Sequence, residues 1–574
     1  MILQALAQYY EDLAKQGKIA RPGWARTKIS YALCIDENGE LEQVIPLLEA
    51  AEGKKPQPQQ FDLPAPVKRT SGVASNFLWD NAGYLLGADA KSKPERSKKS
   101  FEACRQLHHL LLDGMNSSAA KSILAFFDKW DPSIAREHSA LQSDFDAITA
   151  GGNLLFRVNG VFAHEDEQIR QAWQTHYDRS EGNRQQCLIT GNEDVIEAVH
   201  PSIKGVDGAQ SSGAAIVSFN APAFCSYGQE QNYNAPVGKH AAFAYTAALN
   251  YLLADRENVQ KIGDTTVVCW AEGAEPQYQA FTFAALFGKQ QSGISENDLR
   301  DAIRKLADGL PVPERDLDPK RPFYILGLSP NAARLSVRFF YRDSFGRLMK
   351  NVNAHHERLE IVHSPNDFST LPLWALLRET VRPPAKGKPW PDANPVMSGA
   401  TARAIFTGGL YPAALLEQTM LRIRAEQSIT RGKAAIIKAY YLRNPNPDCP
   451  KEVLTVALNE ASTNPAYTLG RLFSVYEAVQ KTVNPDINST IKDKYFNSAA
   501  STPATVFPLL DNLCQKHLRK LDNGKRIWFE KQIMALVAVL GEAYPARLSL
   551  PQQGSFNLGY YHQTQKRFTK KEEQ

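Results

Sequence analysis

The spacing of apolar residues changes once along this 574-residue chain, at a segment rich in Pro, Lys and Gly over residues 382–394. Before it, short apolar runs such as 265–270 and 323–328 are bounded by turn residues, which is typical of strands. After it, apolar residues recur three and four positions apart, as on the buried face of a helix. We therefore predict an α+β protein, with a large mixed α/β region containing small sheets over residues 1–395 and an all-α helical bundle over residues 396–574.

Both predicted regions are long enough to be subdivided. The mixed region has room for two subdomains, which we expect to meet near residues 150–185. In the second region, the prolines between residues 444 and 450 separate an earlier from a later group of helices. Two apolar stripes mark the later group, which covers about 450–574: Leu469, Leu472, Phe473, Tyr476 and Val479, then Phe529, Ile533, Leu536, Leu540 and Tyr544.

Composition excludes several classes of protein. The 66 Lys and Arg exceed the 61 Asp and Glu by only +5, so a nucleic-acid role must come from local basic patches. The seven cysteines are scattered and contain no Cys-x-x-Cys pair, which argues against a disulfide framework or a zinc site. No run approaches the ~18 apolar residues that cross a bilayer. We expect a cytoplasmic protein that uses no cofactor and contacts no membrane.

Two polar loops combine glycine with short side chains. The first covers residues 68–76, contains Gly72 and is anchored by Trp79. The second covers residues 203–213 and leads into the apolar run 214–219, which we expect to be a buried strand. Glycine adopts backbone angles closed to other residues, and short polar side chains offer hydrogen bonds with little bulk. Either loop can lie flat against a phosphate backbone or another chain, and an ordinary surface turn is the alternative.

Two groups of cations accompany these features. The denser group follows the first loop and consists of Lys91, Lys93, Arg96, Lys98 and Lys99. The other group lies in the helical region and consists of Lys516, Arg519, Lys520, Lys525 and Arg526. Cations held beside a groove release counterions from nucleic acid and strengthen binding in a salt-dependent way. Solvated helix surfaces and helix ends are the alternative for both groups.

Common enzymatic motifs are absent from the sequence, including the G-x-x-x-x-G-K-[ST], G-x-G-x-x-G, G-x-S-x-G and H-E-x-x-H patterns. Two weaker constellations remain as alternatives. A hydrolase-like set consists of Ser211 or Ser212, His200 or His240, and Asp207. A metal-ligand set consists of His355, His356 and Glu357, which would converge on one ion only at a helix end or in a loop.

Several segments together resemble the large subunit of the type I-C CRISPR surveillance complex, known as Cascade. The most specific are Cys187-Leu-Ile-Thr-Gly191, the second loop with its apolar run, and Ser226-Tyr-Gly-Gln-Glu-Gln231. The others are residues 1–6, 76–79, 234–236, 263–268, 323–339 and 556–563. The resemblance therefore extends over nearly the whole chain.

The resemblance implies a non-catalytic subunit of a bacterial antiviral complex. Such a subunit recognises a short motif in double-stranded DNA next to the target, promotes duplex opening and offers a docking platform for a helicase-nuclease. Guide crRNA supplies the longer sequence specificity. The implied partners are the crRNA-bearing backbone, the crRNA-end subunits and a small helical subunit.

Within this picture we assign a role to each loop and cation group. The predicted motif readers are Thr70, Ser71, Gly72, Ser75 and Asn76, because the degenerate code of the minor groove needs only small donors and acceptors. The predicted phosphate contacts are Lys68, Arg69, Lys91, Lys93, Arg96, Lys98, Lys99, Lys516, Arg519 and Lys520. The predicted wedge or guide-backbone contacts are Lys204, Gln210, Ser211, Ser212 and Gly213.

The resemblance also implies that an internal translation start can release the end of the reading frame as the small helical subunit. Met420 and Val453 are the two candidate starts in this sequence. Two other functions stay open: a stand-alone metal- or serine-dependent hydrolase or nuclease, and a purely structural scaffold.

Overall fold

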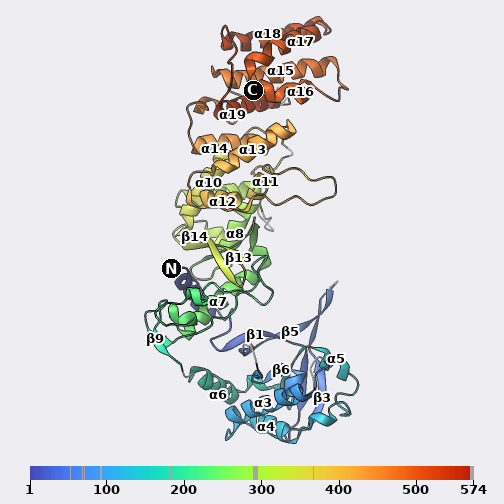
Figure 1. Ribbon diagram of the computed structural model, residues 1–574, viewed down its shortest axis with the longest axis vertical. Coiled ribbons are helices and arrows are strands. Elements are labelled where there is room, and N and C mark those ends of the chain that lie inside the picture. Colours follow the sequence, from blue (N-terminus) through green and yellow to red (C-terminus); the bar gives the residue numbers. More distant parts are fainter. Residues whose placement is uncertain are drawn as a thin grey trace. The chain divides into compact units, whose positions relative to one another are not determined.

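The computed structural model describes residues 1–51, 54–67, 69, 72–90, 94–179, 182–288, 295–365 and 367–568. The chain forms two compact units: Met1–Pro201 with Val217–Tyr251, and Ser202–Ile216 with Leu252–Gln574 (Figure 1). The predicted α+β class is confirmed, with small sheets and a helical C-terminal region. Residues 395–396 lie inside the second unit, and the predicted division into residues 1–395 and 396–574 stays a prediction.

The first unit is built on two small sheets. One has the order β3-β2-β7-β6 with β8 added beside β7, and the other has the order β1-β5-β4. Their strands are β1 Trp24–Ile29, β2 Tyr31–Ile35, β3 Leu41–Pro46, β4 Leu48–Ala51, β5 Lys54–Pro64, β6 Trp79–Asn81, β7 Asn153–Val158 and β8 Val161–Phe162. A further pair, β9 Arg184–Gln186 and β10 Glu193–Val195, is antiparallel. Strands β2 and β7 are parallel, and the remaining pairs of these sheets are antiparallel.

The first unit also contains helices on and beside these sheets. They are α1 Ile2–Lys15, α2 Ala82–Leu85, α3 Pro94–Leu112, α4 Ser118–Lys129, α5 Phe145–Ala150 and α6 Glu167–Asp178, with α7 Lys239–Ala254 later in the chain. Aromatic rings join α3 and α4 to β7, since Phe127 packs against both Phe101 and Phe156 at centroid distances of 5.6 Å. The core of this unit therefore lies between the α3–α4 pair and the sheet.

The second unit begins with an antiparallel meander. Its strands are β11 Gln260–Ile262, β12 Thr265–Ala271, β13 Pro322–Asn331 and β14 Arg334–Ser344, in that order across the sheet. The strands predicted at residues 265–270 and 323–328 are confirmed as β12 and β13. The helices around the sheet are α8 Pro276–Phe287, α9 Glu296–Ala307, α10 Phe345–Leu359, α11 Leu373–Arg378 and α12 Pro395–Thr407.

Residues 214–219 do not form the expected buried strand, so that prediction was wrong. Only Ala214 and Ala215 make bridges, to Ile203 and Arg334 respectively. The chain leaves the second unit after Ile216, and the run therefore has no neighbouring strand along which to continue pairing. An apolar run of this length does not by itself supply the partner that a strand requires.

The C-terminal helices confirm the predicted bundle. They are α13 Ala413–Glu426, α14 Arg431–Arg443, α15 Pro465–Val483, α16 Ile491–Ser501, α17 Pro503–Leu518, α18 Asn523–Leu540 and α19 Leu550–Lys566. The predicted stripe on α15 is buried throughout, and on α18 Phe529, Ile533 and Leu536 are buried. The break between α14 and α15 falls at the prolines, as expected.

Helices α15 and α19 pack backbone against backbone through two glycines. A Cβ atom on Gly470 would overlap the carbonyl oxygen of Phe556, and one on Gly559 would overlap the carbonyl oxygen of Tyr467. Any side chain at either position would push the two helices apart. This pair of glycines therefore sets the spacing at the centre of the bundle.

We expect Gly559→Ala to destabilise the second unit by about 3 kcal/mol, because a well-packed contact with backbone cannot yield without moving a helix. The matched control is Gly399→Ala in α12, where no described atom lies within 4 Å of the added Cβ. That control should stabilise the protein by about 0.5–1 kcal/mol through helix propensity. Urea unfolding measures both, and equal effects of the two substitutions would contradict the role of the glycine contact.

Candidate nucleic-acid interface

The first loop is mounted on the buried carboxylate of Asp80. This carboxylate accepts hydrogen bonds from the backbone N–H groups of Asn76 at 2.9 Å and Asn81 at 2.8 Å, and forms an ion pair with Arg69. Burial raises the pKa of the Asp80 carboxyl, while the Arg69 guanidinium and the N–H groups act in the opposite direction. Three donors therefore offset part of the cost of burying one charge.

Arg69 has a structural position in this loop. Its Nε donates to the carbonyl oxygen of Ala74 at 2.7 Å, and its guanidinium carbon lies 4.0 Å from the ring centroid of Tyr84. Cation–π stacking and the ion pair with Asp80 hold the guanidinium on two sides. This placement favours loop support over the predicted phosphate contact.

The predicted motif readers separate into buried and exposed residues. Ser75 and Asn76 are buried: the Ser75 hydroxyl donates to the Asn76 carbonyl, and the Asn76 side-chain oxygen accepts from the Val67 N–H at 2.9 Å. Gly72 is exposed with φ +92°, and no described atom lies within 4 Å of the position its Cβ would take. Three further predicted contacts lie outside the described residues: Lys68, Thr70 and Ser71.

The loop ends at a strained residue that a histidine holds in place. Leu78 has φ +68°, which is rare for a residue with a side chain, and its N–H donates to Nε2 of His108 at 3.0 Å. Nδ1 of the same ring lies 2.8 Å from the carbonyl oxygen of Cys104, which requires the proton on Nδ1. Burial lowers the pKa of His108 to about 4, so the imidazole is neutral at pH 7.

The denser cation group lies at the start of α3. Arg96, Lys98 and Lys99 are exposed, whereas Ser97 and Ser100 on the opposite side of the helix are buried. The positive end of the α3 dipole adds to the field of these cations. Two other members of the group, Lys91 and Lys93, lie outside the described residues.

The second loop is closed by backbone pairing and has an exposed tip. Ile203 and Ala214 exchange two backbone hydrogen bonds of 2.8 and 2.9 Å, and the Asp207 N–H donates to Thr266 Oγ1 at 3.0 Å. Gly213 has φ +98°, and a Cβ there would come within 2.9 Å of the Ile203 carbonyl oxygen. The other predicted contacts of this loop are exposed: Lys204, Gln210, Ser211 and Ser212.

The histidines and the aspartate of the hydrolase-like set have other partners. Nδ1 of His200 lies 2.7 Å from the Tyr245 hydroxyl, and Nε2 of His240 lies 2.9 Å from the Glu11 carboxylate. Asp207 forms a 2.8 Å ion pair with a lysine of β11. Burial lowers the pKa of His200 to about 4. Catalytic use of these residues stays a hypothesis.

The metal-ligand set lies at the C-terminal end of α10, whose last turn contains His356. Nδ1 of His355 lies 2.6 Å from the Tyr411 hydroxyl, and the Glu357 carboxylate accepts from the Asn353 amide at 2.8 Å. Burial lowers the pKa of His356 to about 4. In the part of the chain that the structure describes, no three His, Cys, Asp or Glu side chains are grouped as metal ligands.

The cations predicted in the helical region lie near helix ends. Three are exposed at the C-terminal end of α17: Lys516, Arg519 and Lys520. Cations at this end of a helix stabilise its dipole, which gives them a structural role of their own. In α18, Lys525 pairs with Asp522 at 3.2 Å and Arg526 with Glu530 at 3.8 Å.

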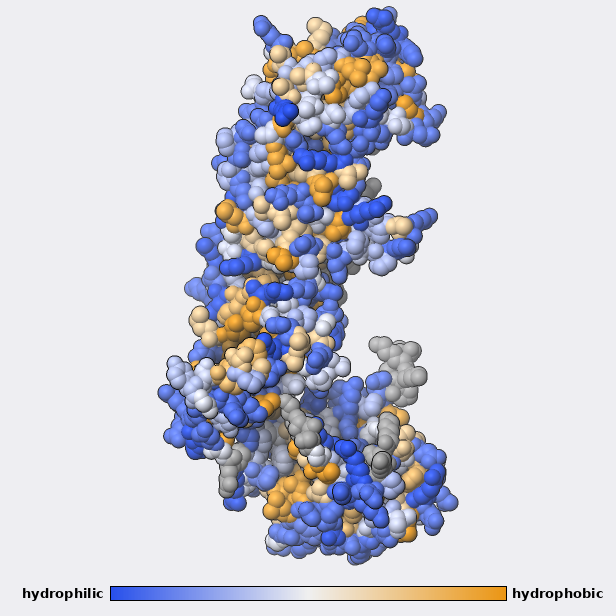
Figure 2. Space-filling model, in the orientation of Figure 1, coloured by the Kyte–Doolittle hydropathy of each residue, from blue (hydrophilic) through white to orange (hydrophobic). Residues whose placement is uncertain are grey.

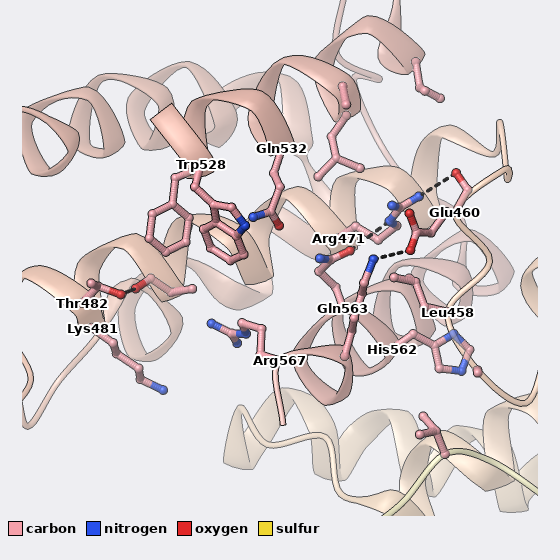
Figure 3. Close-up of a pocket in the computed structure, with 18 residues that line it drawn as sticks. Leu458, Glu460, Arg471, Lys481, Thr482, Trp528, Gln532, His562, Gln563 and Arg567 are labelled. Atoms are coloured by element: carbon pink, nitrogen blue, oxygen red, sulfur yellow. Dashed lines mark hydrogen bonds and ion pairs between the residues drawn. The ribbon is translucent and has the colours of Figure 1, made fainter. Parts of the chain in front are cut away.

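Sequence reasoning missed a cleft of about 1010 Å³ between α15, α18 and α19 in the second unit. Trp528 and Gln532 point into it from α18, and Arg567 faces them from the end of α19 (Figure 3). At one end, buried Arg471 donates through Nε to the Gln563 side chain at 3.1 Å. The residues come from helices far apart in sequence, so no local motif marks the cleft.

Comparison with known proteins identifies the class of the chain. A family model described as CRISPR-associated protein (Cas_Csd1) matches residues 6–568. The chain therefore belongs to the Cas_Csd1 family of CRISPR-associated proteins. A comparison with curated proteins gives no match. Among the described helices, none combines the length and apolar character needed to span a membrane.

We expect Asp80→Ala to destabilise the first unit by about 3 kcal/mol, because three donors lose a buried acceptor. Amide hydrogen exchange at Asn76 should accelerate, and urea unfolding gives the free energy. The control is Asp62→Ala, which removes an ion pair with Arg26 whose side chains are 48% and 57% exposed. That change should cost about 0.5 kcal/mol. Unchanged exchange at Asn76 in Asp80→Ala would show that the carboxylate does not hold the loop.

Proposed function

We propose that this chain is the non-catalytic large subunit of an RNA-guided CRISPR interference complex of the type I-C Cascade kind. It binds double-stranded target DNA at a short flanking motif and promotes opening of the duplex. Membership of the CRISPR-associated family is the observation that carries this proposal. The geometry of the first loop and of α3 supports it.

The support comes from an exposed glycine in a loop whose neighbouring residues are held by buried hydrogen bonds. Gly72 presents backbone alone to solvent, while Asp80 and Asn76 fix the flanks of the loop. A tip of this kind fits a minor groove about 6 Å wide, whose edges carry a degenerate code read by small groups. Because Ser75 and Asn76 are buried, we assign the reading role to the tip and a supporting role to these two residues.

Phosphate attraction would come from the start of α3. Arg96, Lys98 and Lys99 are exposed along its first two turns, and such cations position a protein on DNA without reading its sequence. The tip of the second loop, from Gln210 to Gly213, would act as a wedge or contact the guide-bearing backbone. Docking of a helicase-nuclease and assembly with a small helical subunit complete the proposal. The site of action would be the cytoplasm, where its seven free cysteines stay reduced.

We expect Gly72→Trp to reduce or abolish discrimination between flanking motifs, because an indole at the tip blocks approach to the groove floor. The matched control is Gly114→Trp, an exposed glycine of the same unit with φ +78° and no described atom within 4 Å of its Cβ position. Both substitutions place a side chain at a positive φ. Gel shifts of the assembled complex on duplexes that differ in the flanking motif measure the effect.

If Gly72→Trp kept full motif selectivity, the residues that recognise the motif would lie elsewhere in the chain. A complex without motif preference in the unsubstituted protein would favour a structural scaffold. DNA cleavage by the purified chain with Mg²⁺ or Mn²⁺ would favour a nuclease instead.

We expect the double substitution Lys98→Ala and Lys99→Ala to weaken binding to all duplexes alike. For every phosphate that is no longer neutralised, the slope of log K against log salt should become shallower by about 0.9. Titrations at several salt concentrations measure this slope. The control is Lys121→Ala on α4, another exposed lysine, which should leave the slope unchanged. A change confined to one motif would contradict a phosphate-contacting role.

A further inference from the structure

The cleft between α15, α18 and α19 has one wall made by a single stripe of α18. The stripe consists of Trp528, Gln532, Ala535 and Val539, all of which line the cleft. These positions are four, seven and eleven residues from the first, so they share one face over about 16 Å at roughly 1.5 Å of rise per residue. Trp528 is 54% exposed and Val539 is 38% exposed. The wall is thus an open, largely apolar surface three helical turns long.

Apolar side chains are also exposed elsewhere on α18. Ile527 and Met534 are 47% and 70% exposed. Orange apolar residues interrupt the hydrophilic surface at the C-terminal end of the molecule, where α17 and α18 lie (Figure 2). Several large apolar side chains exposed together on one helix are more typical of a contact site than of a solvated bundle.

The cleft also contains hydrogen-bond donors, both on α18 and on the side of α19 that faces it. Three buried nitrogen atoms that line it have no partner among the described residues: Nε of Arg567, Nε2 of His562 and Nε2 of Gln532. Arg567 Nε and the Gln532 amide are donors in every protonation state at neutral pH. Burial lowers the pKa of His562 to about 4, and its Nδ1 lies 2.8 Å from the Tyr467 hydroxyl. These donors favour a ligand that brings acceptor oxygens.

The cations at the rim already have acidic partners. Lys566 pairs with Glu460, and Lys481 pairs with Glu477 at 2.7 Å. A strand of nucleic acid is held by a continuous track of cations that meet successive phosphates. Here the positive charge outside these ion pairs is local, at the partly buried Arg567, which forms no ion pair among the described residues although Glu477 acts on it electrostatically. This arrangement suits one or two carboxylates better than a polyanion.

We propose that this cleft binds an acidic amphipathic segment of a protein partner. Apolar side chains of the segment lie against Trp528, Ala535 and Val539, and a carboxylate accepts hydrogen bonds from Arg567. A short helix laid into such a groove contacts it through residues spaced like those of the stripe. The cleft and the DNA-reading loop belong to different units, so each proposal can fail alone.

The test is a selection of random 16-residue peptides displayed on phage against the full chain. Selected sequences should combine Asp or Glu with large apolar residues at helical spacing. A synthetic peptide of the consensus sequence, followed by fluorescence anisotropy, should bind at least tenfold more weakly to Ala535→Trp, which fills the exposed middle of the stripe. Arg567→Gln should weaken the same peptide at least fivefold and should shift the selected consensus away from Asp and Glu.

The matched control is Met534→Ala, which changes the adjacent, more exposed residue of the same helix outside the cleft. It should leave peptide affinity within twofold, and thermal unfolding checks that all three variants are folded. If Ala535→Trp does not fold, the peptide affinity of Arg567→Gln tests the proposal instead. Selection of no acidic apolar consensus, or affinity unchanged in the cleft variants, overturns the proposal. So does a 12-nucleotide oligothymidylate that binds the chain and loses affinity in those variants, because the cleft would then accept single-stranded nucleic acid.

Discussion

The contact between α15 and α19 is the constraint on which the helical part of the second unit depends. Gly470 and Gly559 let the two backbones meet, so residues of both helices converge on the same cleft. With α19 this close, the side chain of Gln563 reaches Arg471 and that of His562 reaches Tyr467. A wider spacing would leave these buried polar groups without partners, at a cost of about 1–3 kcal/mol for each group.

In the first unit, buried polar contacts rather than close helix packing fix the position of neighbouring segments. Asp80 gathers a guanidinium and two backbone N–H groups, and His108 holds the strained Leu78 next to them. A buried charge contributes little net stability, but it makes other arrangements of the loop costly because they would leave that charge unpaired. The position of the loop is therefore specified even though its net stabilisation is small.

Much of the local structure could be predicted from periodicity and turn chemistry. The Asn-Gly turn before Glu40 joins β2 to β3, and the apolar stripe of α15 is buried. The run at residues 214–219 could not be assigned correctly, because pairing depends on a neighbouring strand that the sequence does not specify. Likewise, Asn76 is buried with its side chain bonded to the Val67 N–H across the loop. The composition of the loop does not show which of its polar residues are exposed for binding and which support the loop from inside.

By itself, the sequence determined the α+β class, the helical C-terminal region, the position of the glycine loop and the resemblance to CRISPR-associated proteins. These properties are carried by spacing and by residue identity, which are local. Only the tertiary structure decided that Arg69 turns inward to Asp80 and that Trp528 faces Arg567 across a cleft. Such neighbours are set by which helices and loops pack together, and packing depends on contacts between residues tens of positions apart in the chain.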